Sequence, residues 1–370
     1  FFETVSGFTT TGASILTDVE AMSKGLLFWR SFTHWIGGMG VLVFLVALLP
    51  LSGGSNVHLL RAESTGPSVS KLVPKVRPSA KILYFIYIGI TLCEIVFLLF
   101  GGMSLFEALT LSFGTAGTGG FGIVNSSVAD YSPYVQNTIT VFMILFGIDF
   151  TVYYLILTRR WRDALKSDEY KVYLSVILVS ALLISVNCRY LFPDFATSLR
   201  HGFFQTASII TTTGYSTANF DLWPSLSKTI LVVLMFVGAC AGSTGGGIKV
   251  SRILILLKSI RKEIKISAHP KSTHKISMNG KTIEHETVRN VSVYIAVFLV
   301  LYAVSMLIIS FDNLDFTTNF TAVAATINNI GPGLGLVGPV ENFSLFSPLS
   351  KIVLSLNMLI GRLEIFPILM

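Results

Sequence analysis

Long apolar runs alternate with short polar segments along the whole chain. The longest runs occupy residues 82–100, 135–157, 172–191 and 291–311. A helix needs about 20 predominantly apolar residues to cross the hydrocarbon core of a bilayer, which is about 30 Å thick. Each run approaches or exceeds that length, so the pattern predicts four membrane-spanning helices.

Between these runs lie apolar segments that are too short to span a membrane. The clearest occupy residues 105–113 and 316–327, and each is followed by a segment rich in Gly, Thr or Asn. A helix of about ten residues covers only about 15 Å, so the chain has to return to the side from which it entered. Irregular backbone at membrane depth is tolerated only where it is buried in protein or lines a water-filled cavity. The pattern therefore predicts re-entrant loops.

The loop sequences repeat. Thr9–Ser14 (TTTGAS) closely resembles Thr211–Ser216 (TTTGYS), and weaker copies lie at Thr115–Phe121 and Asn328–Pro332. Their aligned glycines, at positions 12, 119, 214 and 331, are 107, 95 and 117 residues apart. Self-similarity at a near-constant spacing indicates a repeated structural unit. We therefore expect an all-α polytopic membrane protein of four pseudo-repeats, each a membrane helix, a re-entrant pore loop and a second membrane helix, around one pore.

The repeats define the expected organisation of the chain. Residues 1–78 form the first repeat without its first helix, plus a cytoplasmic loop, and residues 79–168 form the second. Residues 169–283 form the third repeat with a glycine-rich segment and a basic loop, and residues 284–370 form a truncated fourth repeat. The chain begins at Phe1 rather than Met and stops inside an apolar run. We therefore expect a fragment whose flanking membrane segments are missing.

Composition fits a chain that is dissolved mostly in lipid. Charged residues make up 13% of the chain and hydrophobic residues 52%, with a mean hydropathy of +0.70, whereas soluble domains carry about 25% charged residues. The net charge of +7 could suggest nucleic acid, but 20 of the 27 Lys and Arg residues lie in the stretches 61–81, 159–171 and 249–289. Their alternation with nearly uncharged connections follows the positive-inside rule and places them in the cytoplasm. We expect a multi-pass protein that contacts lipid and no nucleic acid.

The loop residues favour cation permeation over catalysis. Glycine permits backbone conformations that turn successive carbonyls toward one line, and rings of carbonyl oxygens can replace the hydration shell of a monovalent cation. The loops have no ring of carboxylates, which a divalent-cation pore would use. Gly117–Gly122 matches G-x-G-x-x-G, but no strand–helix–strand pattern surrounds it. We expect no enzyme activity and no tightly bound cofactor.

Several motifs, spread over nearly the whole chain, resemble those of one family and occur in the same order. They are Ser6–Ser14, Trp35–Gly40, Ala62–Pro67, Thr211–Gly214, Gly242–Gly247, Ile330–Pro332 and Gly361–Glu364. These motifs are similar to those of the Trk/Ktr/HKT superfamily of potassium transporters, closest to its TrkH-type membrane subunit. The resemblance implies potassium uptake across the bacterial inner membrane by a homodimer with one pore per subunit. It also implies a cytoplasmic TrkA-type regulator that binds nucleotide.

The resemblance further assigns residues to a selectivity filter for the potassium ion. Transferred onto this chain, they are Thr10, Thr11, Gly12, Gly117, Thr118, Gly119, Thr212, Thr213, Gly214, Asn329, Ile330 and Gly331. Sodium-preferring relatives carry a serine where this chain has Gly12, which implies potassium permeation. The second and fourth loops depart from the Thr-Thr-Thr-Gly form of the other two.

A second glycine-rich segment suggests a gate. Residues 228–257 could form one long helix, but five glycines lie within Gly238–Gly247 and predict a break at membrane depth. The resemblance implies an intramembrane gate loop there, formed by Gly238, Gly242, Ser243, Thr244, Gly245, Gly246 and Gly247. An arginine inside an apolar run is costly when it faces lipid, and the resemblance places Arg362 near this loop. Our hypothesis is that Arg362 holds the closed conformation.

Other assignments have two interpretations. Asp149 lies inside an apolar run and either attracts cations into the cavity or, if the protein is a symporter of potassium with sodium or protons, is the coupling site. The basic stretch 252–289 either meets anionic lipid headgroups or docks the cytoplasmic regulator.

Trp35–Gly40 is interpreted as a close helix-packing motif. Arg30, near the start of a span, is expected to extend its charge to the membrane interface.

Overall fold

The computed structural model describes residues 1–40, 76–269 and 275–363. The predicted motif Ala62–Pro67 and residue Glu364 lie outside these ranges. The described part of the chain is predominantly helical, and its one strand pair is a short antiparallel hairpin.

Three helices of the described chain are long and apolar enough to cross a membrane. They are α5 (Val76–Phe100), α10 (Asp168–Asn187) and α14 (His285–Ile309). They confirm three of the four predicted spanning helices. A further apolar helix, α12 (Ser225–Val237), is shorter.

The fourth predicted span, residues 135–157, is wrong as a single helix. The chain forms α7 (Pro133–Phe146) and α8 (Phe150–Leu157), whose axes are bent by 89°. The carboxylate of Asp149 caps α8 by accepting a hydrogen bond from the backbone N–H of Thr151 at 2.8 Å. A side chain that binds a nearby backbone group competes with continuation of a helix, which explains a bend inside an apolar run.

Four other helices each lead into one of the predicted loops. They are α1 (Phe2–Phe8), α6 (Leu105–Gly117), α11 (Phe195–Ile210) and α15 (Phe316–Ile327). Three of them begin at a side-chain cap. Ser104 caps α6 in a capping box with Glu107, Asp194 caps α11, and Asp315 caps α15. Such caps satisfy N–H groups that a helix leaves unpaired at its start. These helices therefore begin where local sequence directs.

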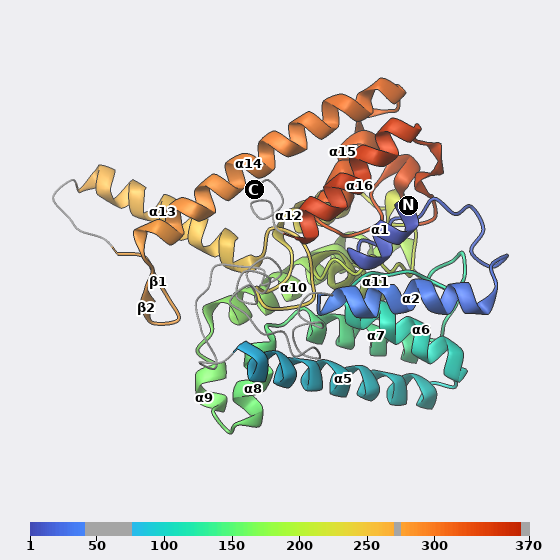
Figure 1. Ribbon diagram of the computed structural model, residues 1–370, viewed down its shortest axis with the longest axis horizontal. Helices are drawn as coiled ribbons and strands as arrows, with labels where there is room; N and C mark the ends of the chain where they lie inside the picture. The colour runs from blue at the N-terminus through green and yellow to red at the C-terminus, as the bar shows by residue number, and fades with distance from the viewer. Residues whose placement is uncertain (41–75, 270–274, 364–370) are drawn as a thin grey trace.

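The remaining elements connect and cover these helices. They are α2 (Lys24–Gly38), α9 (Trp161–Ala164), α13 (Val250–Ala268), α16 (Pro348–Arg362), β1 (Ser277–Met278), β2 (Lys281–Thr282), and the 3-10 turns η1 (Arg189–Leu191), η2 (Phe220–Leu222), η3 (Ser310–Asp312), η4 (Gly335–Val337) and η5 (Phe343–Leu345). Helices α1 and α6 pack on α2, α11 packs on α10, and α15 packs on α16 (Figure 1). The predicted break within residues 228–257 is confirmed, because α12 ends at Val237 and α13 begins at Val250.

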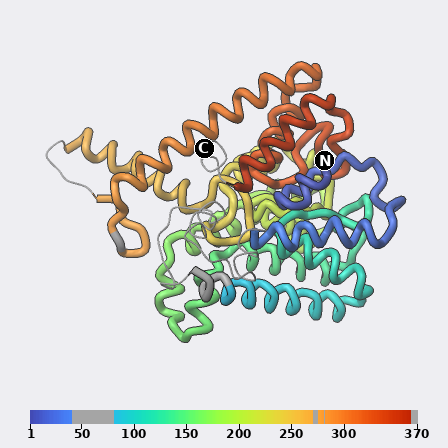
Figure 2. The backbone as a smooth tube through the Cα atoms, in the orientation of Figure 1, coloured from blue at the N-terminus to red at the C-terminus, as the bar shows by residue number. Residues whose placement is uncertain are grey.

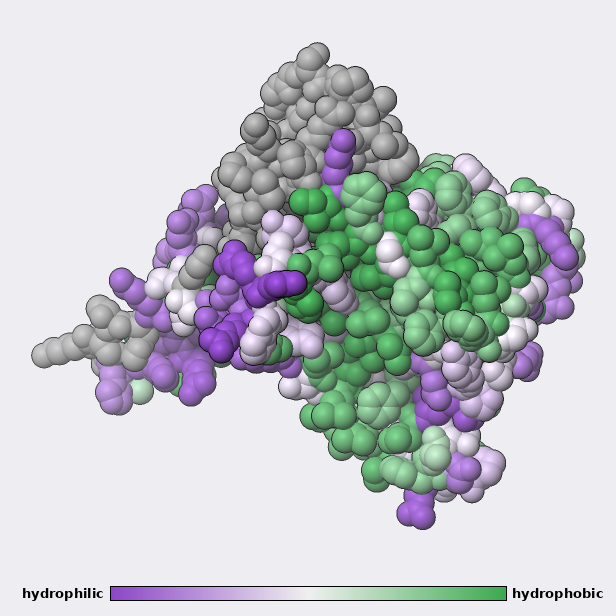
Figure 3. All heavy atoms as spheres, turned by 90° about the horizontal axis from the view of Figure 1, so that it is seen from below, coloured by the Kyte–Doolittle hydropathy of each residue, from purple (hydrophilic) through white to green (hydrophobic). Residues whose placement is uncertain are grey.

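An apolar surface covers one face of the helical body. Hydrophobic residues occupy the middle of the face in Figure 3, and hydrophilic residues gather at its left and right ends. Phe85, Phe97 and Phe100 on α5 are among the exposed large apolar side chains. Soluble monomers rarely expose contiguous apolar patches larger than a few hundred Å². The surface and the spanning helices together indicate a membrane protein.

Candidate functional site

The four loops that follow α1, α6, α11 and α15 share one backbone conformation. In each, a non-glycine residue has φ between 54° and 59°, and a left-handed glycine follows two residues later. The non-glycine residues are Thr10, Thr118, Thr212 and Asn329, and the glycines are Gly12, Gly120, Gly214 and Gly331. Positive φ is uncommon outside glycine, so four occurrences at matching positions make these loops alike in geometry.

Hydrogen bonds establish the register between the loops. At the residue after each left-handed Thr or Asn, the backbone N–H donates to the carbonyl five residues earlier at 2.8–2.9 Å; the donors are Thr11, Gly119, Thr213 and Ile330. Gly119 therefore corresponds to Thr11, and Gly120 corresponds to Gly12. The predicted alignment of Gly119 with Gly12 is wrong by one residue, and Gly117 is the last residue of α6. Two consecutive glycines made both alignments compatible with the sequence.

The loops contact one another in a closed cycle. Gly12 lies so close to the carbonyl of Gly119 that any side chain at position 12 would collide with it. The same contact recurs from each loop to the next, joining Gly120 to the Thr213 carbonyl, Gly214 to the Ile330 carbonyl and Gly331 to the Thr11 carbonyl. The absence of Cβ permits this approach at positive φ. The last contact returns to the first loop, so the four loops meet around a common centre.

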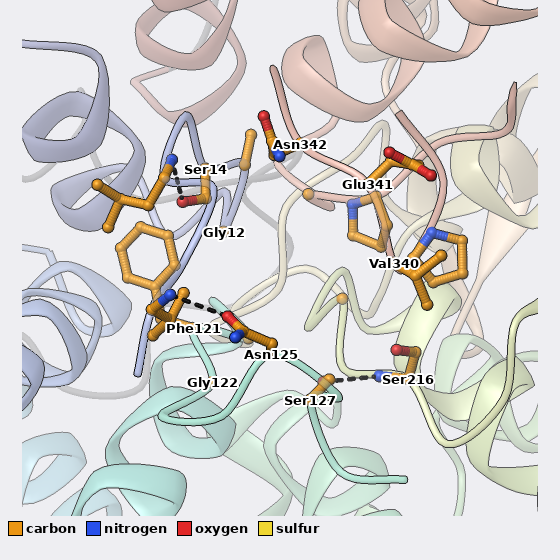
Figure 4. Close-up of a pocket in the computed structure, with 18 of the residues that line it drawn as sticks. Gly12, Ser14, Phe121, Gly122, Asn125, Ser127, Ser216, Val340, Glu341 and Asn342 are labelled. Atoms are coloured by element: carbon orange, nitrogen blue, oxygen red, sulfur yellow. Dashed lines mark hydrogen bonds between the residues drawn. The ribbon is translucent and has the colours of Figure 1, made fainter. Parts of the chain in front are cut away.

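Beyond these glycines, the outgoing segments of successive loops are also joined. The bonds run from Val19 N–H to Asn125 Oδ1 (2.9 Å), Val128 N–H to the Ser216 carbonyl (3.0 Å), Gly335 N–H to Asp221 Oδ1 (3.1 Å) and Phe343 N–H to the Ser14 carbonyl (2.8 Å). Three of these bonds involve residues that line a pocket, which has Ser14, Asn125, Ser216 and Glu341 on its different sides (Figure 4). The pocket is also lined by the four left-handed glycines of the loops. It therefore leads to the centre at which the loops meet.

The left-handed Thr and Asn residues are fully buried. Thr10, Thr118, Thr212 and Asn329 are each 0% exposed. The Thr212 hydroxyl accepts a hydrogen bond from the N–H of Gly246 at 2.6 Å, and the Thr118 hydroxyl donates to the carbonyl of Thr244 at 3.0 Å. The second and third loops are thus in direct contact with the glycine-rich segment, residues 238–249.

The glycine-rich segment fills the break between α7 and α8. The N–H of Cys240 donates to the Gly147 carbonyl at 3.0 Å, and the N–H of Phe150 donates to the Gly242 carbonyl at 3.1 Å. Backbone N–H and C=O groups that are buried need hydrogen-bond partners in irregular segments as well as in helices. Here two irregular segments satisfy each other, so the position of one depends on the other.

Arg362, the last residue of α16, joins the glycine-rich segment to α2. Its guanidinium donates to the carbonyl of Thr244 at 2.7 Å and to that of Gly38 at 2.8 Å, and it also donates to the Gly37 carbonyl. The expected proximity of Arg362 to this segment is confirmed. All three acceptors are backbone carbonyls, so these contacts depend on the conformation of the segment.

Two further charged residues hold the same segment and were missed at the sequence level. The carboxylate of Glu169, at the start of α10, accepts hydrogen bonds from the N–H groups of Ala241 at 2.7 Å and Ser251 at 3.0 Å. The buried amine of Lys249 donates to the Gly245 carbonyl. Lys249 begins a basic stretch, where positive charges are expected for topological reasons alone, and its position directly after the glycine-rich run was the available signal. Glu169 lies 72 positions before Ala241, so no local signal linked it to the segment.

The family of the chain follows from sequence comparison. A family model named TrkH and described as cation transport protein matches residues 1–186 and 189–370. The Trk system potassium uptake protein TrkH of Salmonella typhimurium is 35% identical over 378 residues, covering 100% of this chain and 77% of that protein. The TrkH protein of Vibrio parahaemolyticus is 36% identical over 383 residues, with the same two coverages.

The fold leads to the same family. In the crystal structure of the potassium transporter TrkH from Vibrio parahaemolyticus, the matching chain has a TM-score of 0.88 and 32% sequence identity, over 100% of this chain and 76% of that one. The resemblance to the Trk/Ktr/HKT superfamily is thereby confirmed. On its sequence and its fold, the chain belongs to the TrkH family of cation transport proteins.

Proposed function

We propose that this protein takes up potassium across the bacterial inner membrane through the centre of its four loops. The observation that carries the proposal is the closed cycle of loops with one shared left-handed backbone. The similar proteins named above are potassium uptake proteins, which supports the same cargo here. In this proposal each loop is re-entrant, the fold consists of four pseudo-repeats around one pore, and potassium moves down its electrochemical gradient.

The proposed filter is made of backbone carbonyls. Its residues are Thr10, Thr11, Gly12, Thr118, Gly119, Gly120, Thr212, Thr213, Gly214, Asn329, Ile330 and Gly331, so that Gly120 replaces the predicted Gly117. Carbonyl oxygens at this centre would substitute for the hydration shell of the ion. Helices α6, α11 and α15 end at these loops, and the partial negative charge at a helix C-terminus favours a cation.

The glycine-rich segment is the proposed gate. It contacts the second and third loops through Thr118 and Thr212, where it would narrow the passage. Arg362, Glu169 and Lys249 hold it in the observed conformation, which we assign to the closed state. Opening then requires the segment to exchange these contacts for others.

A regulator and a second subunit complete the proposal. Helix α13 and the β1–β2 hairpin project from the helical body (Figure 2), and α13 carries the basic residues Lys258, Arg261 and Lys262. This surface suits a cytoplasmic TrkA-type regulator, and the same charges would attract anionic lipid headgroups. Because α13 directly follows the glycine-rich segment, a force on α13 would reach the gate. The proposed functional unit is a homodimer with one pore per subunit.

A symporter is the second candidate function. The carboxylate of Asp149 lies beside Gly242 of the glycine-rich segment, where a bound sodium ion or proton would be linked to movement of the gate. In that case potassium flux would require the second ion. The capping contact of Asp149 with Thr151 accounts for its presence without such a role, so we favour the channel-like pathway.

The experiment that tests the proposed function measures potassium and sodium flux through the full-length protein in liposomes. Serine at Gly12 would collide with the Gly119 carbonyl and would adopt φ near 79°, which costs about 1–2 kcal/mol for a non-glycine residue. We expect Gly12→Ser to displace the filter carbonyls and to lower the potassium-to-sodium permeability ratio. Gly102→Ser is the matched control, because Gly102 has φ of 81° and nothing within 4 Å of an added Cβ.

The outcomes separate the hypotheses. Selective potassium flux in the wild type, lost in Gly12→Ser and kept in Gly102→Ser, supports the filter. Selectivity that Gly12→Ser leaves intact contradicts the assignment of this loop. No flux of either ion, even with a regulator present, contradicts the pathway itself.

A further inference from the structure

Arg30 and Glu3 form a largely buried ion pair at the edge of the pocket. The expectation that Arg30 extends to the membrane interface is wrong, because its side chain is 9% exposed and lies 3.3 Å from the Glu3 carboxylate. Arg30 belongs to α2 and Glu3 to α1. Taking two charges out of water is unfavourable unless additional hydrogen bonds satisfy their remaining polar atoms. The further partners of this pair are therefore informative.

Glu3 holds the outgoing segment of the first loop. Its Oε1 accepts hydrogen bonds from the Ser14 hydroxyl at 2.7 Å and from the N–H of Ile15 at 2.6 Å. Its Oε2 accepts from the guanidinium of Arg30, and Nη2 of Arg30 also lies 3.4 Å from the Ser14 hydroxyl. One oxygen of the Glu3 carboxylate thus binds the loop, and the other binds the arginine. Ser14 is two residues beyond the proposed filter residue Gly12.

Arg30 holds the outgoing segment of the second loop. Its guanidinium carbon lies 3.9 Å from the centroid of the Phe121 ring, and Nη1 lies 3.5 Å from the Gly122 carbonyl. His34, one turn further along α2, stacks on the same ring with centroids 4.1 Å apart. A cation over an aromatic face is attracted most strongly where water is excluded, and Phe121 is 2% exposed. Phe121, which follows Gly120, is therefore held by two side chains of α2.

We infer that Arg30 is a positioning residue that sets the spacing between the first two loops and, through it, the selectivity for potassium. The inference rests on the proposed function. The Glu3–Arg30 pair links Ser14 of the first loop to Gly122 of the second. The contact of Gly12 with the Gly119 carbonyl joins the same two loops at the filter. A shift of either outgoing segment changes the distance between carbonyls that would replace the hydration shell of the ion.

The pairing also explains how a positive charge is accommodated at the mouth of a cation pathway. Arg30 lines the pocket, and an uncompensated cation there would repel an incoming cation. The carboxylate of Glu3 neutralises it within the pair. The ion pair thus holds the outgoing segments of the first two loops in place and adds no net charge at the entrance.

The test compares Arg30→Lys with wild type in the full-length protein, reconstituted in liposomes. Lysine keeps the charge but lacks the planar fork that reaches Glu3, Ser14 and Gly122 together. We expect the potassium-to-sodium permeability ratio, measured from reversal potentials, to fall about tenfold, equivalent to about 1.4 kcal/mol of lost discrimination. Arg160→Lys is the matched control, because Arg160 forms an exposed ion pair with Asp163 at 2.9 Å. Its ratio should stay at the wild-type value.

Each outcome decides for or against the inference. A folded Arg30→Lys protein with a wild-type ratio overturns it, and so does a fall in maximal flux at constant ratio, which is the effect of a merely structural residue. If Arg30→Lys does not yield monodisperse protein, Phe121→Leu decides instead, because it removes the aromatic face and leaves the ion pair in place. A lower ratio in that variant supports the inference, and an unchanged ratio overturns it. A wild type without selective potassium flux contradicts the proposed function rather than the role of Arg30 within it.

Discussion

Buried and half-buried charged side chains around the four loops bind irregular backbone. Arg362, Glu169 and Lys249 bind peptide groups of the glycine-rich segment, and Arg30 binds a carbonyl of the second loop. Burying a charge is costly, and so is burying a peptide group without a hydrogen-bond partner. One contact offsets both costs, because hydrogen bonds that involve a charged group are stronger than neutral ones. Charged side chains therefore lie beside irregular backbone, where they bind peptide groups that would otherwise have no hydrogen-bond partner.

Replacing Arg362 with alanine should favour an open gate. The substitution removes its hydrogen bonds to the carbonyls of Thr244 and Gly38, and a loss of about 1.4 kcal/mol changes the closed-to-open ratio tenfold. We expect higher potassium flux and open probability in the absence of any regulator. Lys351→Ala is the control, because Lys351 lies on the same helix and donates to the exposed Ser344 carbonyl. Unchanged flux and open probability in Arg362→Ala would falsify the gate hypothesis.

At the scale of elements, three of the helices that lead into the loops begin at local signals. Ser104, Asp194 and Asp315 each accept a hydrogen bond from a backbone N–H of the first turn. The opposite ends are delimited by left-handed Thr or Asn residues, which an α-helix cannot include. Because positive φ is uncommon outside glycine, local sequence sets where these three helices begin but not where they end.

Replacing Asp315 with alanine should destabilise α15. The carboxylate accepts hydrogen bonds from the N–H of Thr318 at 3.0 Å and from its hydroxyl at 2.5 Å. Loss of an N-cap costs about 1 kcal/mol, which should lower the midpoint of thermal unfolding in detergent. Asp315→Asn is the control, because asparagine caps equally well. A midpoint that falls equally in both variants would show that the charge, and not the cap, is responsible.

The same carboxylate should make stability depend on pH. Hydrogen bonds from the hydroxyl and the backbone N–H of Thr318 hold the pKa of Asp315 below its usual range. A carboxyl group whose pKa is lower in the folded state stabilises that state above the unfolded pKa, and the contribution is lost as pH falls through the folded pKa. Acidification through that window should therefore destabilise the wild type more than Asp315→Asn. Parallel pH profiles of the two proteins would contradict this.

At the scale of the whole molecule, the central feature is a cycle closed between segments that are far apart in the chain. The contact of Gly331 with the Thr11 carbonyl connects the last loop to the first. Nearby, the N–H of Phe343 donates a hydrogen bond to the carbonyl of Ser14. Interactions of this kind constrain all four loops together. The spacing at the centre is therefore a property of the assembled molecule, and a local substitution such as Gly12→Ser acts on the neighbouring loop.

The reversal potential of the intact protein should respond to potassium alone. In the proposed pathway Asp149 acts as the cap of α8, so Asp149→Asn should keep both the cap and the reversal potential. The measurement imposes potassium gradients with and without a sodium or proton gradient. Flux that needs both ions, with coupling lost in Asp149→Asn, would favour the symporter.

The sequence by itself determined three of the four predicted spanning helices, the break after α12 and the family. The long apolar runs predicted α5, α10 and α14, and five glycines predicted the break after α12. Motifs spread over nearly the whole chain, such as Ser6–Ser14, Trp35–Gly40 and Gly242–Gly247, predicted the family that the comparisons show. These signals are local, because hydropathy and helix propensity are read within one segment of the chain. They are therefore available without knowledge of what the segment contacts.

Only the tertiary structure decided the register of the loops and the partners of the charges. A shift by one residue between Gly119 and Gly120 leaves the local pattern unchanged, and hydrogen bonds within the folded loop were needed to distinguish them. The burial of Arg30 beside Glu3 and the contact of Glu169 with Ala241 likewise join separate segments. The physical reason is that the cost of a buried charge or an unpaired peptide group depends on what the rest of the chain brings to it.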